Sequence, residues 1–204
     1  MTAESDSIRI YEESLALHGD SYRSLNWGSS EGQILRFEVL SKIADLNCKS
    51  ILDVGCGLGH FADWLETNRI AAAYSGVELT PGLAHAARRR RPDLEIANGS
   101  ILSPECLSGR TFDYVFASGI FYTYVENGYA VLRDSIAGMW NLCSLGIAFN
   151  SLSTWAAEKD FNEFYADPLV VLNIAREFTP WVVLRHDYHA RDFTVYMKRE
   201  RSEA

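Results

Sequence analysis

The sequence lacks the marks of several protein classes. No apolar run in its 204 residues approaches the length of a bilayer-spanning helix, which takes about 20 residues. Residues 1–6 are acidic and polar, unlike the start of a signal peptide. The four cysteines form no Cys-x-x-Cys pair, so we expect reduced thiols, no metal site and a cytoplasmic protein.

Positive charge is also scarce. The chain has 19 Lys and Arg residues against 27 Asp and Glu, a formal net charge of -8. A large nucleic-acid footprint needs clustered Lys and Arg, so this balance argues against a nucleic-acid partner. The one basic run, residues 88–91, stands just before Pro92. Cations favour the carboxyl end of a helix, so we expect the run to close one, with an anion site as the alternative.

Apolar segments of strand length alternate with helical patterns along the chain. We expect strands at 51–54, 72–79, 94–97, 112–118, 145–149, 181–184 and 193–197. This alternation predicts an α/β fold with a doubly wound, mostly parallel sheet. The last two strands are too close in sequence for a helical crossover, so they must form an antiparallel hairpin.

The length suits one domain over residues 1–204. Within it we distinguish an N-terminal cap segment (1–29) from a core (30–200). The first core helix is expected to begin at Ser30, which would act as N-cap with Gln33 completing a capping box. At the next helix but one, Thr80 is the expected N-cap and Pro81 takes the first helical position.

The chain is organised around residues 51–61, Ile-Leu-Asp-Val-Gly-Cys-Gly-Leu-Gly-His-Phe. They predict a buried strand, a glycine turn that a ligand can approach closely, and the start of a helix. The dinucleotide fingerprint wants a glycine at its sixth position, where this chain has His60. Asp53 stands two residues before the first glycine, where a carboxylate would repel a pyrophosphate but attract an ammonium group.

The stretch Asp53-x-Gly55-x-Gly57-x-Gly59 resembles motif I of the class I S-adenosylmethionine-dependent methyltransferases. The resemblance covers roughly residues 30–200 and implies a Rossmann-like sheet of seven strands with the last inserted antiparallel. It also implies S-adenosylmethionine as the cofactor. Asp53, Gly55, Cys56 and Gly57 would then form the cofactor-binding turn.

Other cofactor contacts follow from the ends of the next strands. Glu78 ends the second strand, where the family has an acid that holds the ribose hydroxyls, and Leu79 would lie against the adenine. The third strand leads to Gly99, Ser100 and Ile101. The family often carries Gly-Asp there, so Ser100 is a departure that leaves adenine recognition to its hydroxyl or to backbone groups.

The methionine end of the cofactor is expected near the fourth strand. Backbone groups around Ser118 should meet it, and Arg36 either reaches its carboxylate or is an ordinary surface charge. Trp27 and Tyr22 either close over the cofactor or pack against the sheet edge.

The sequence indicates the class of acceptor mainly through motifs that it lacks. The chain has neither the Pro-Pro motif of the amino-methylating nucleic-acid enzymes nor a Pro-Cys pair, which favours a small-molecule acceptor. A neutral-pH base is expected at the strand-end rim, either His186 or His189 after the sixth strand, unless that polar cluster is only a hairpin turn. His18 with Tyr22 is the other candidate. We expect the acceptor pocket among residues 11–27, 118–126, 151–165 and 185–189.

Two other functions remain open at this stage. A nucleotide-dependent oxidoreductase would keep the fold but needs phosphate room at the glycine turn, which Asp53 and His60 disfavour. A non-catalytic S-adenosylmethionine-binding partner or regulatory subunit gains some support from Ser100. We expect no membrane association and either a monomer or a homodimer.

Overall fold

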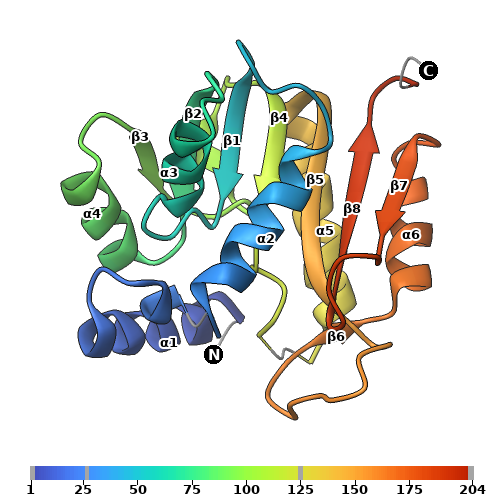
Figure 1. The fold of residues 1–204 in the computed structure, drawn as a ribbon, viewed down its shortest axis with the longest axis horizontal. Helices are drawn as coiled ribbons and strands as arrows, with labels where there is room; N and C mark the ends of the chain where they lie inside the picture. Colours follow the sequence, from blue (N-terminus) through green and yellow to red (C-terminus); the bar gives the residue numbers. More distant parts are fainter. Residues whose placement is uncertain (1–2, 26–27, 124–125, 202–204) are drawn as a thin grey trace.

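The computed structural model describes residues 3–25, 28–123 and 126–201. Its centre is a mixed sheet with the strand order β3-β2-β1-β4-β5-β8-β7 (Figure 1). The strands are β1 (Ser50–Val54), β2 (Ala73–Glu78), β3 (Glu95–Asn98), β4 (Phe112–Ala117), β5 (Cys143–Ser153), β6 (Tyr165–Ala166), β7 (Val182–Arg185) and β8 (Asp192–Lys198). The helices are α1 (Ala3–His18), α2 (Ser30–Ser41), α3 (His60–Thr67), α4 (Pro81–Arg90), α5 (Gly128–Leu142) and α6 (Pro168–Arg176), with short 3-10 turns η1 (Tyr22–Leu25) and η2 (Pro104–Leu107).

The direction of the strands confirms the expected doubly wound sheet. Strands β1 to β5 pair in parallel, β8 pairs antiparallel with β5, and β7 pairs antiparallel with β8. The predicted terminal hairpin is therefore present. One detail differs from the seven strands expected, because β6 adds a two-residue strand that pairs with the far end of β5. Its two residues carry no periodic pattern that a sequence could reveal.

Alternating side chains along the strands give the sheet two packed faces. Ile51 and Phe116 pack with α2 and α3 on one face, whereas Leu52 and Val115 belong to the larger core under α5 and α6. Strand residues point alternately to opposite faces, so a strand covered on both sides is apolar throughout. This explains why β1 reads as a continuous apolar run interrupted only by Asp53.

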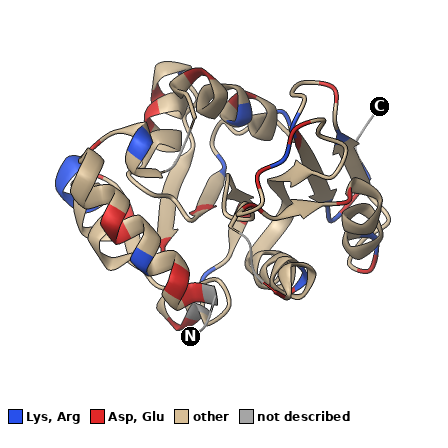
Figure 2. Cartoon of the chain, turned by 90° about the horizontal axis from the view of Figure 1, so that it is seen from below, with Lys and Arg blue, Asp and Glu red and all other residues tan. Residues whose placement is uncertain are grey.

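Helix α1 lies along the edge toward which β1 and β4 point (Figure 1). Figure 2 looks onto this edge and shows α1 carrying charges of both signs. The helix is fastened to α4, because the Gly82 N–H donates to the Glu12 carboxylate at 2.8 Å. The N-terminal segment thus covers the carboxyl ends of the parallel strands, where open α/β sheets bind their ligands.

The ends of the helices test the expected caps. Helix α2 is capped by Ser29, whose hydroxyl accepts from the Gly32 N–H at 3.0 Å, so the prediction of Ser30 was wrong by one residue. Both serines can cap a helix, and the sequence alone does not choose between them. Thr80 is the N-cap of α4, as expected, although its side chain makes no capping hydrogen bond. Arg91 follows α4 and pairs with Asp63 at 2.6 Å, which supports the structural role of the basic run.

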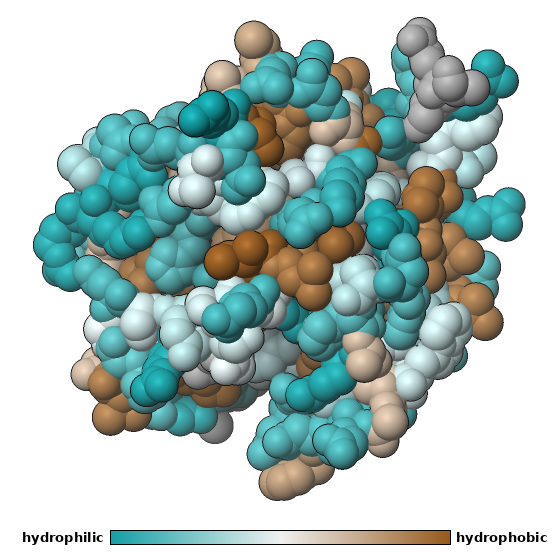
Figure 3. Space-filling view, in the orientation of Figure 1, coloured by the Kyte–Doolittle hydropathy of each residue, from teal (hydrophilic) through white to brown (hydrophobic). Residues whose placement is uncertain are grey.

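The surface carries scattered apolar groups. Figure 3 shows a largely hydrophilic face with a hydrophobic group over the β7 edge, where Val183 is 46% exposed. Within the described ranges, no helix combines the length and apolarity that crossing a membrane requires. All four cysteines are free thiols, as expected.

Candidate active site

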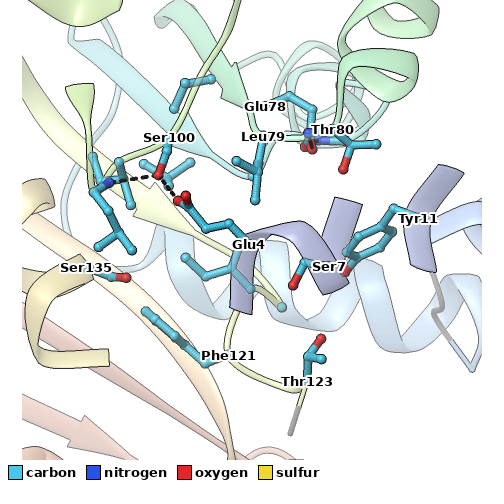
Figure 4. A pocket seen from close by; sticks show the side chains of 18 of the residues that line it. Glu4, Ser7, Tyr11, Glu78, Leu79, Thr80, Ser100, Phe121, Thr123 and Ser135 are labelled. Carbon is cyan, nitrogen blue, oxygen red and sulfur yellow. Dashed lines mark hydrogen bonds between the residues drawn. The ribbon is translucent and has the colours of Figure 1, made fainter. Parts of the chain in front are cut away.

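A cavity of about 170 Å³ opens at the carboxyl ends of β1, β2 and β4, beneath α1. Figure 4 shows Glu78 and Leu79 on one side of it and Phe121 and Ser135 on the other, with α1 across its mouth. We call it the first cavity. It brings together most of the predicted cofactor residues: Gly55, Gly57, Glu78, Leu79, Gly99, Ser100, Ile101 and Ser118.

The glycine turn lines this cavity with bare main chain. Gly55 and Gly57 have φ angles of +69° and +55°, a region that side chains disfavour. A Cβ at Gly57 would come within 2.7 Å of Leu25, and one at Gly55 would overlap the Ile120 side chain. Both positions therefore favour glycine, because Ile120 and Leu25 fill the space that a side chain would take.

Glu78 is held rigidly at the end of β2. One of its carboxylate oxygens accepts from the Gly57 N–H and the other from the Thr80 N–H, each at 2.8 Å. Burial raises the pKa of Glu78, and these backbone hydrogen bonds oppose the rise. Each oxygen keeps a further lone pair, so the side chain can still accept hydrogen bonds from a pair of ligand hydroxyls.

Asp53 and Cys56 do not line the cavity, contrary to expectation. The Asp53 carboxylate is buried behind the glycine turn and accepts from the Tyr74 hydroxyl at 2.8 Å. Burial raises the pKa of Asp53 to about 7, and the Tyr74 hydrogen bond opposes this. The Cys56 side chain packs beneath the turn against Gly76 and Ile96, and burial raises its pKa as well. Strand alternation puts Asp53 on the face toward α2 and α3 rather than at the cavity.

The Ser118 hydroxyl is a further candidate for ligand binding. It is buried, and within the described residues it has no hydrogen-bond partner. Buried polar groups are normally satisfied, so an orphan on a cavity wall points to a ligand that completes it. Ser118 lines the first cavity at the end of β4, where the sequence predicted a contact.

A second cavity of about 330 Å³ adjoins the first and shares Leu25, Gly119 and Phe121 with it. Its wall is polar and charged. The additional residues include Arg36, Tyr122, Asn150, Glu163, His189, Arg191 and Asp192. Arg36 forms an ion pair with the buried Asp192.

The imidazole of His189 completes a cluster on the wall of the second cavity. Its Nδ1 lies 2.9 Å from the Asp192 carboxylate and accepts a hydrogen bond from the Arg191 N–H at 3.1 Å. Burial lowers the pKa of His189 and Asp192 opposes this, whereas burial raises the pKa of Asp192. The neutral form of the ring is thereby favoured, which a proton acceptor needs.

Arg36 was expected at the methionine end of the cofactor, with an ordinary surface charge as the alternative. It is neither exposed nor in the first cavity, because the ion pair with Asp192 holds it in the second.

Three of the four candidate catalytic residues, His186, His18 and Tyr22, line neither cavity. His186 hydrogen-bonds to the Ser153 hydroxyl at 2.7 Å and lies between the rings of Trp155 and Phe193. His18 is exposed at the end of α1, and Tyr22 faces Arg23. The alternative of a structural polar cluster therefore fits His186 better. Trp27 lies outside the described residues.

Sequence analysis missed the contribution of α1 to the first cavity. Glu4, Ser7 and Tyr11 project from this helix into it (Figure 4). The Tyr11 ring meets Tyr122 edge to face at 6.4 Å, and burial raises the Tyr11 pKa. Glu4 accepts a hydrogen bond from Ser100. The helix itself was predicted from its apolar spacing, but nothing in that spacing shows what the polar residues touch.

Comparison with known families gives one consistent result. Residues 51–137 match the model of a family described as a methyltransferase domain. This span runs from β1 into α5 and includes the glycine turn, Glu78 and Ser118. It therefore covers most of the wall of the first cavity and leaves the second largely outside.

Individual proteins extend the likeness along the chain. A protein of Mycobacterium tuberculosis that is provisionally named a methyltransferase is 28% identical over 157 residues, covering 74% of this chain and 93% of that protein. The structure of magnesium protoporphyrin IX methyltransferase from Synechocystis with bound S-adenosylmethionine is 11% identical, with a TM-score of 0.65 over 97% of this chain and 98% of that one.

A third likeness is partial. An O-methyltransferase family protein from Burkholderia thailandensis is 13% identical with a TM-score of 0.64, over 82% of this chain and 56% of that one. The chain thus spans little more than half of that relative. The structural likenesses show a shared fold, and the family match includes the glycine turn.

Proposed function

We propose that this chain is a class I S-adenosylmethionine-dependent methyltransferase and that it transfers a methyl group from S-adenosylmethionine to a small-molecule acceptor. The first cavity would hold the cofactor and the adjoining second cavity the acceptor. The two cavities meet at Leu25, Gly119 and Phe121, so the methyl group would cross there.

The residues present fit the cofactor. The turn at Gly55 and Gly57 presents bare main chain to the cavity, and the orphaned Ser118 hydroxyl offers a hydrogen bond. S-adenosylmethionine carries its methyl group on a cationic sulfur, so it brings its own activation to the reaction. The protein's part is then to align the two reactants and to receive a proton where the acceptor loses one.

The observation that carries the proposal is the position of Glu78. Its buried carboxylate ends β2 at the cavity wall, and two backbone hydrogen bonds fix both of its oxygens. A fixed carboxylate with lone pairs to spare suits the two neighbouring hydroxyls of a ribose. Dinucleotide-binding folds carry a ribose-binding acid at the same place, so NADH is the comparison ligand for this site.

The second cavity offers a group that can take up a proton. In this structure Nδ1 of His189 accepts from the Arg191 N–H, which puts the proton of the neutral ring on Nε2. A shift of that proton to Nδ1, where it would be donated to Asp192 in place of the Arg191 bond, frees Nε2 as an acceptor. Of the three candidate bases His186, His189 and His18, we assign this role to His189. In a methyl-transfer assay, His189→Asn should lower kcat/KM by about 100-fold or more and remove the acidic limb of its pH profile. An unchanged profile would rule this role out.

Calorimetric titration with S-adenosylhomocysteine tests the cofactor site directly. The wild-type chain should bind it with micromolar affinity, and NADH should not bind. Glu78→Gln should weaken S-adenosylhomocysteine binding at least tenfold, because hydrogen bonds to a charged group are worth about 1.5–3 kcal/mol. The matched control is Glu95→Gln, whose side chain is 64% exposed at the opposite end of β3. Binding of NADH instead, or equal loss in both variants, would contradict the proposal.

A further inference from the structure

Helix α1 places a carboxylate at the end of β3. Ser100 donates its hydroxyl proton to Glu4, although the two residues are far apart in the sequence. The Ser100 Oγ in turn accepts from the Leu102 N–H at 3.0 Å. The only proton of this hydroxyl is therefore directed at Glu4, and the serine fixes the position of the carboxylate.

Glu4 retains capacity to accept hydrogen bonds. Its bond from Ser100 uses Oε1, and within the described residues Oε2 has no hydrogen-bond partner. The side chain lines the first cavity (Figure 4). An ionised carboxylate has about four acceptor positions, so Glu4 can take a hydrogen bond from a ligand without releasing Ser100.

The geometry relative to Glu78 limits what that ligand group can be. Glu78 pairs in register with Asn98, so the cavity wall continues from the end of β2 to the end of β3. A nucleoside with its ribose on Glu78 would lay its base along this wall, against the apolar side chains of Leu79, Ile101 and Leu102. The polar edge of the base would then face Ser100 and Glu4. Since a carboxylate only accepts, the matching edge must carry a donor.

We propose that Glu4 accepts a hydrogen bond from the 6-amino group of the cofactor's adenine, with Ser100 as its positioning residue. This rests on the proposed function and adds to it a determinant of base specificity supplied by the N-terminal helix. A carbonyl at the same position, as in hypoxanthine, would face the carboxylate lone pairs and be rejected. The anchoring of α1 on α4 through Glu12 and Gly82 keeps this carboxylate in place.

The test compares the binding of S-adenosylhomocysteine with that of S-inosylhomocysteine by calorimetry. The wild type should favour the adenine compound by about tenfold or more, as expected for a hydrogen bond to a charged group. Glu4→Gln should weaken S-adenosylhomocysteine binding about tenfold and reduce this preference, because the amide can turn its donor toward a carbonyl. Glu13→Gln is the matched control, since it removes the same charge from an exposed site on the same helix.

A second variant tests whether the preference for adenine requires a carboxylate at this site. Ser100→Asp in the Glu4→Gln background returns an acid to the end of β3 and should restore the preference for adenine. The same Ser100→Asp change in the wild type sets two carboxylates side by side and should weaken binding. If Glu4→Gln keeps the wild-type preference, the inference is overturned and the proposed function stands. If the wild type binds neither compound, the proposed function itself fails.

Discussion

The buried carboxylates near the glycine turn are stabilised by hydrogen bonds, whereas the buried carboxylate in the second cavity is stabilised by ion pairs. Asp53 and Glu78 are 3% and 5% exposed, and they receive hydrogen bonds from Tyr74 and from backbone N–H groups. Across the described ranges, neither takes part in an ion pair. Asp192, 2% exposed, instead lies against the guanidinium of Arg36 and the imidazole of His189.

This difference matters for what each region can bind. Hydrogen bonds alone leave the negative charge near the turn unneutralised, so donors or a cation on a ligand gain by approaching it. The second cavity neutralises its own charges, so under the proposed function an acceptor molecule there would have to fit among ion pairs that already exist. The first region would then select its ligand by charge, and the second would select the acceptor mainly by shape.

The pH dependence of stability tests the first half of this comparison. Burial raises the pKa of Asp53 to about 7 from an ordinary 3.8, so the folded protein holds this proton more tightly than the unfolded chain. The folded state binds more protons between these values, and the free energy of unfolding should therefore fall as pH rises from about 4 to 7. The fall attributable to Asp53 should be on the order of 4 kcal/mol.

Urea unfolding of wild type and Asp53→Asn across this pH range measures that contribution. The asparagine keeps an acceptor for the Tyr74 hydroxyl but cannot titrate. The free energy of unfolding of the variant should therefore rise relative to that of the wild type as pH rises. Parallel stability curves would mean that Asp53 is ionised throughout and that its charge is compensated after all.

Removing a partner in the second cavity should have the next largest effect. Asp192→Asn leaves the Arg36 guanidinium, whose side chain is only 12% exposed, without its carboxylate. Breaking a buried pair in this way typically costs about 3 kcal/mol or more. Urea unfolding at pH 7 should register this loss.

An exposed ion pair serves as the control. Glu177→Gln breaks the ion pair with Arg133. The Arg133 side chain is 53% exposed and the Glu177 side chain 47% exposed. Such a change should cost less than about 1 kcal/mol. Equal losses for the two variants would show that burial does not distinguish the Arg36–Asp192 pair.

The sequence predicted the first region far better than the second, and the reason is physical. Gly55, Gly57 and Glu78 follow one another at strand ends, and a parallel sheet brings such ends together. Their positions depend on local rules: apolar runs, a glycine turn and an acid one strand away. The same rules gave the strand alternation and the terminal hairpin.

The second cavity depends on contacts that no local pattern records. Arg36 on α2 contacts Asp192 at the start of β8, and His189 beside them belongs to the polar turn before that strand. His186 and His189 both lie in this turn and are the same residue type, so only the folded chain shows which one lines the cavity. The contact between Glu4 and Ser100 is equally remote in sequence, because α1 packs on α4 as well as on the adjacent η1.

The smallest effect concerns shape rather than charge in the first region. Gly55→Ala adds a methyl group where φ is +69° and where the Ile120 side chain fills the space. Left-handed backbone costs an alanine about 1–2 kcal/mol, and the overlap adds to this, so we expect a loss of about 2 kcal/mol or slightly more. Gly109→Ala isolates the backbone term, since Gly109 also has a positive φ, +76°, but has nothing within 4 Å of its added Cβ. Thermal or urea unfolding of the two variants separates the terms. If Gly55→Ala lowers the free energy of unfolding no more than Gly109→Ala does, the Ile120 side chain moves aside freely and its packing does not require a glycine at this position. A larger loss for Gly55→Ala means that close packing against Ile120 sets the shape of the turn, independently of the nearby carboxylates.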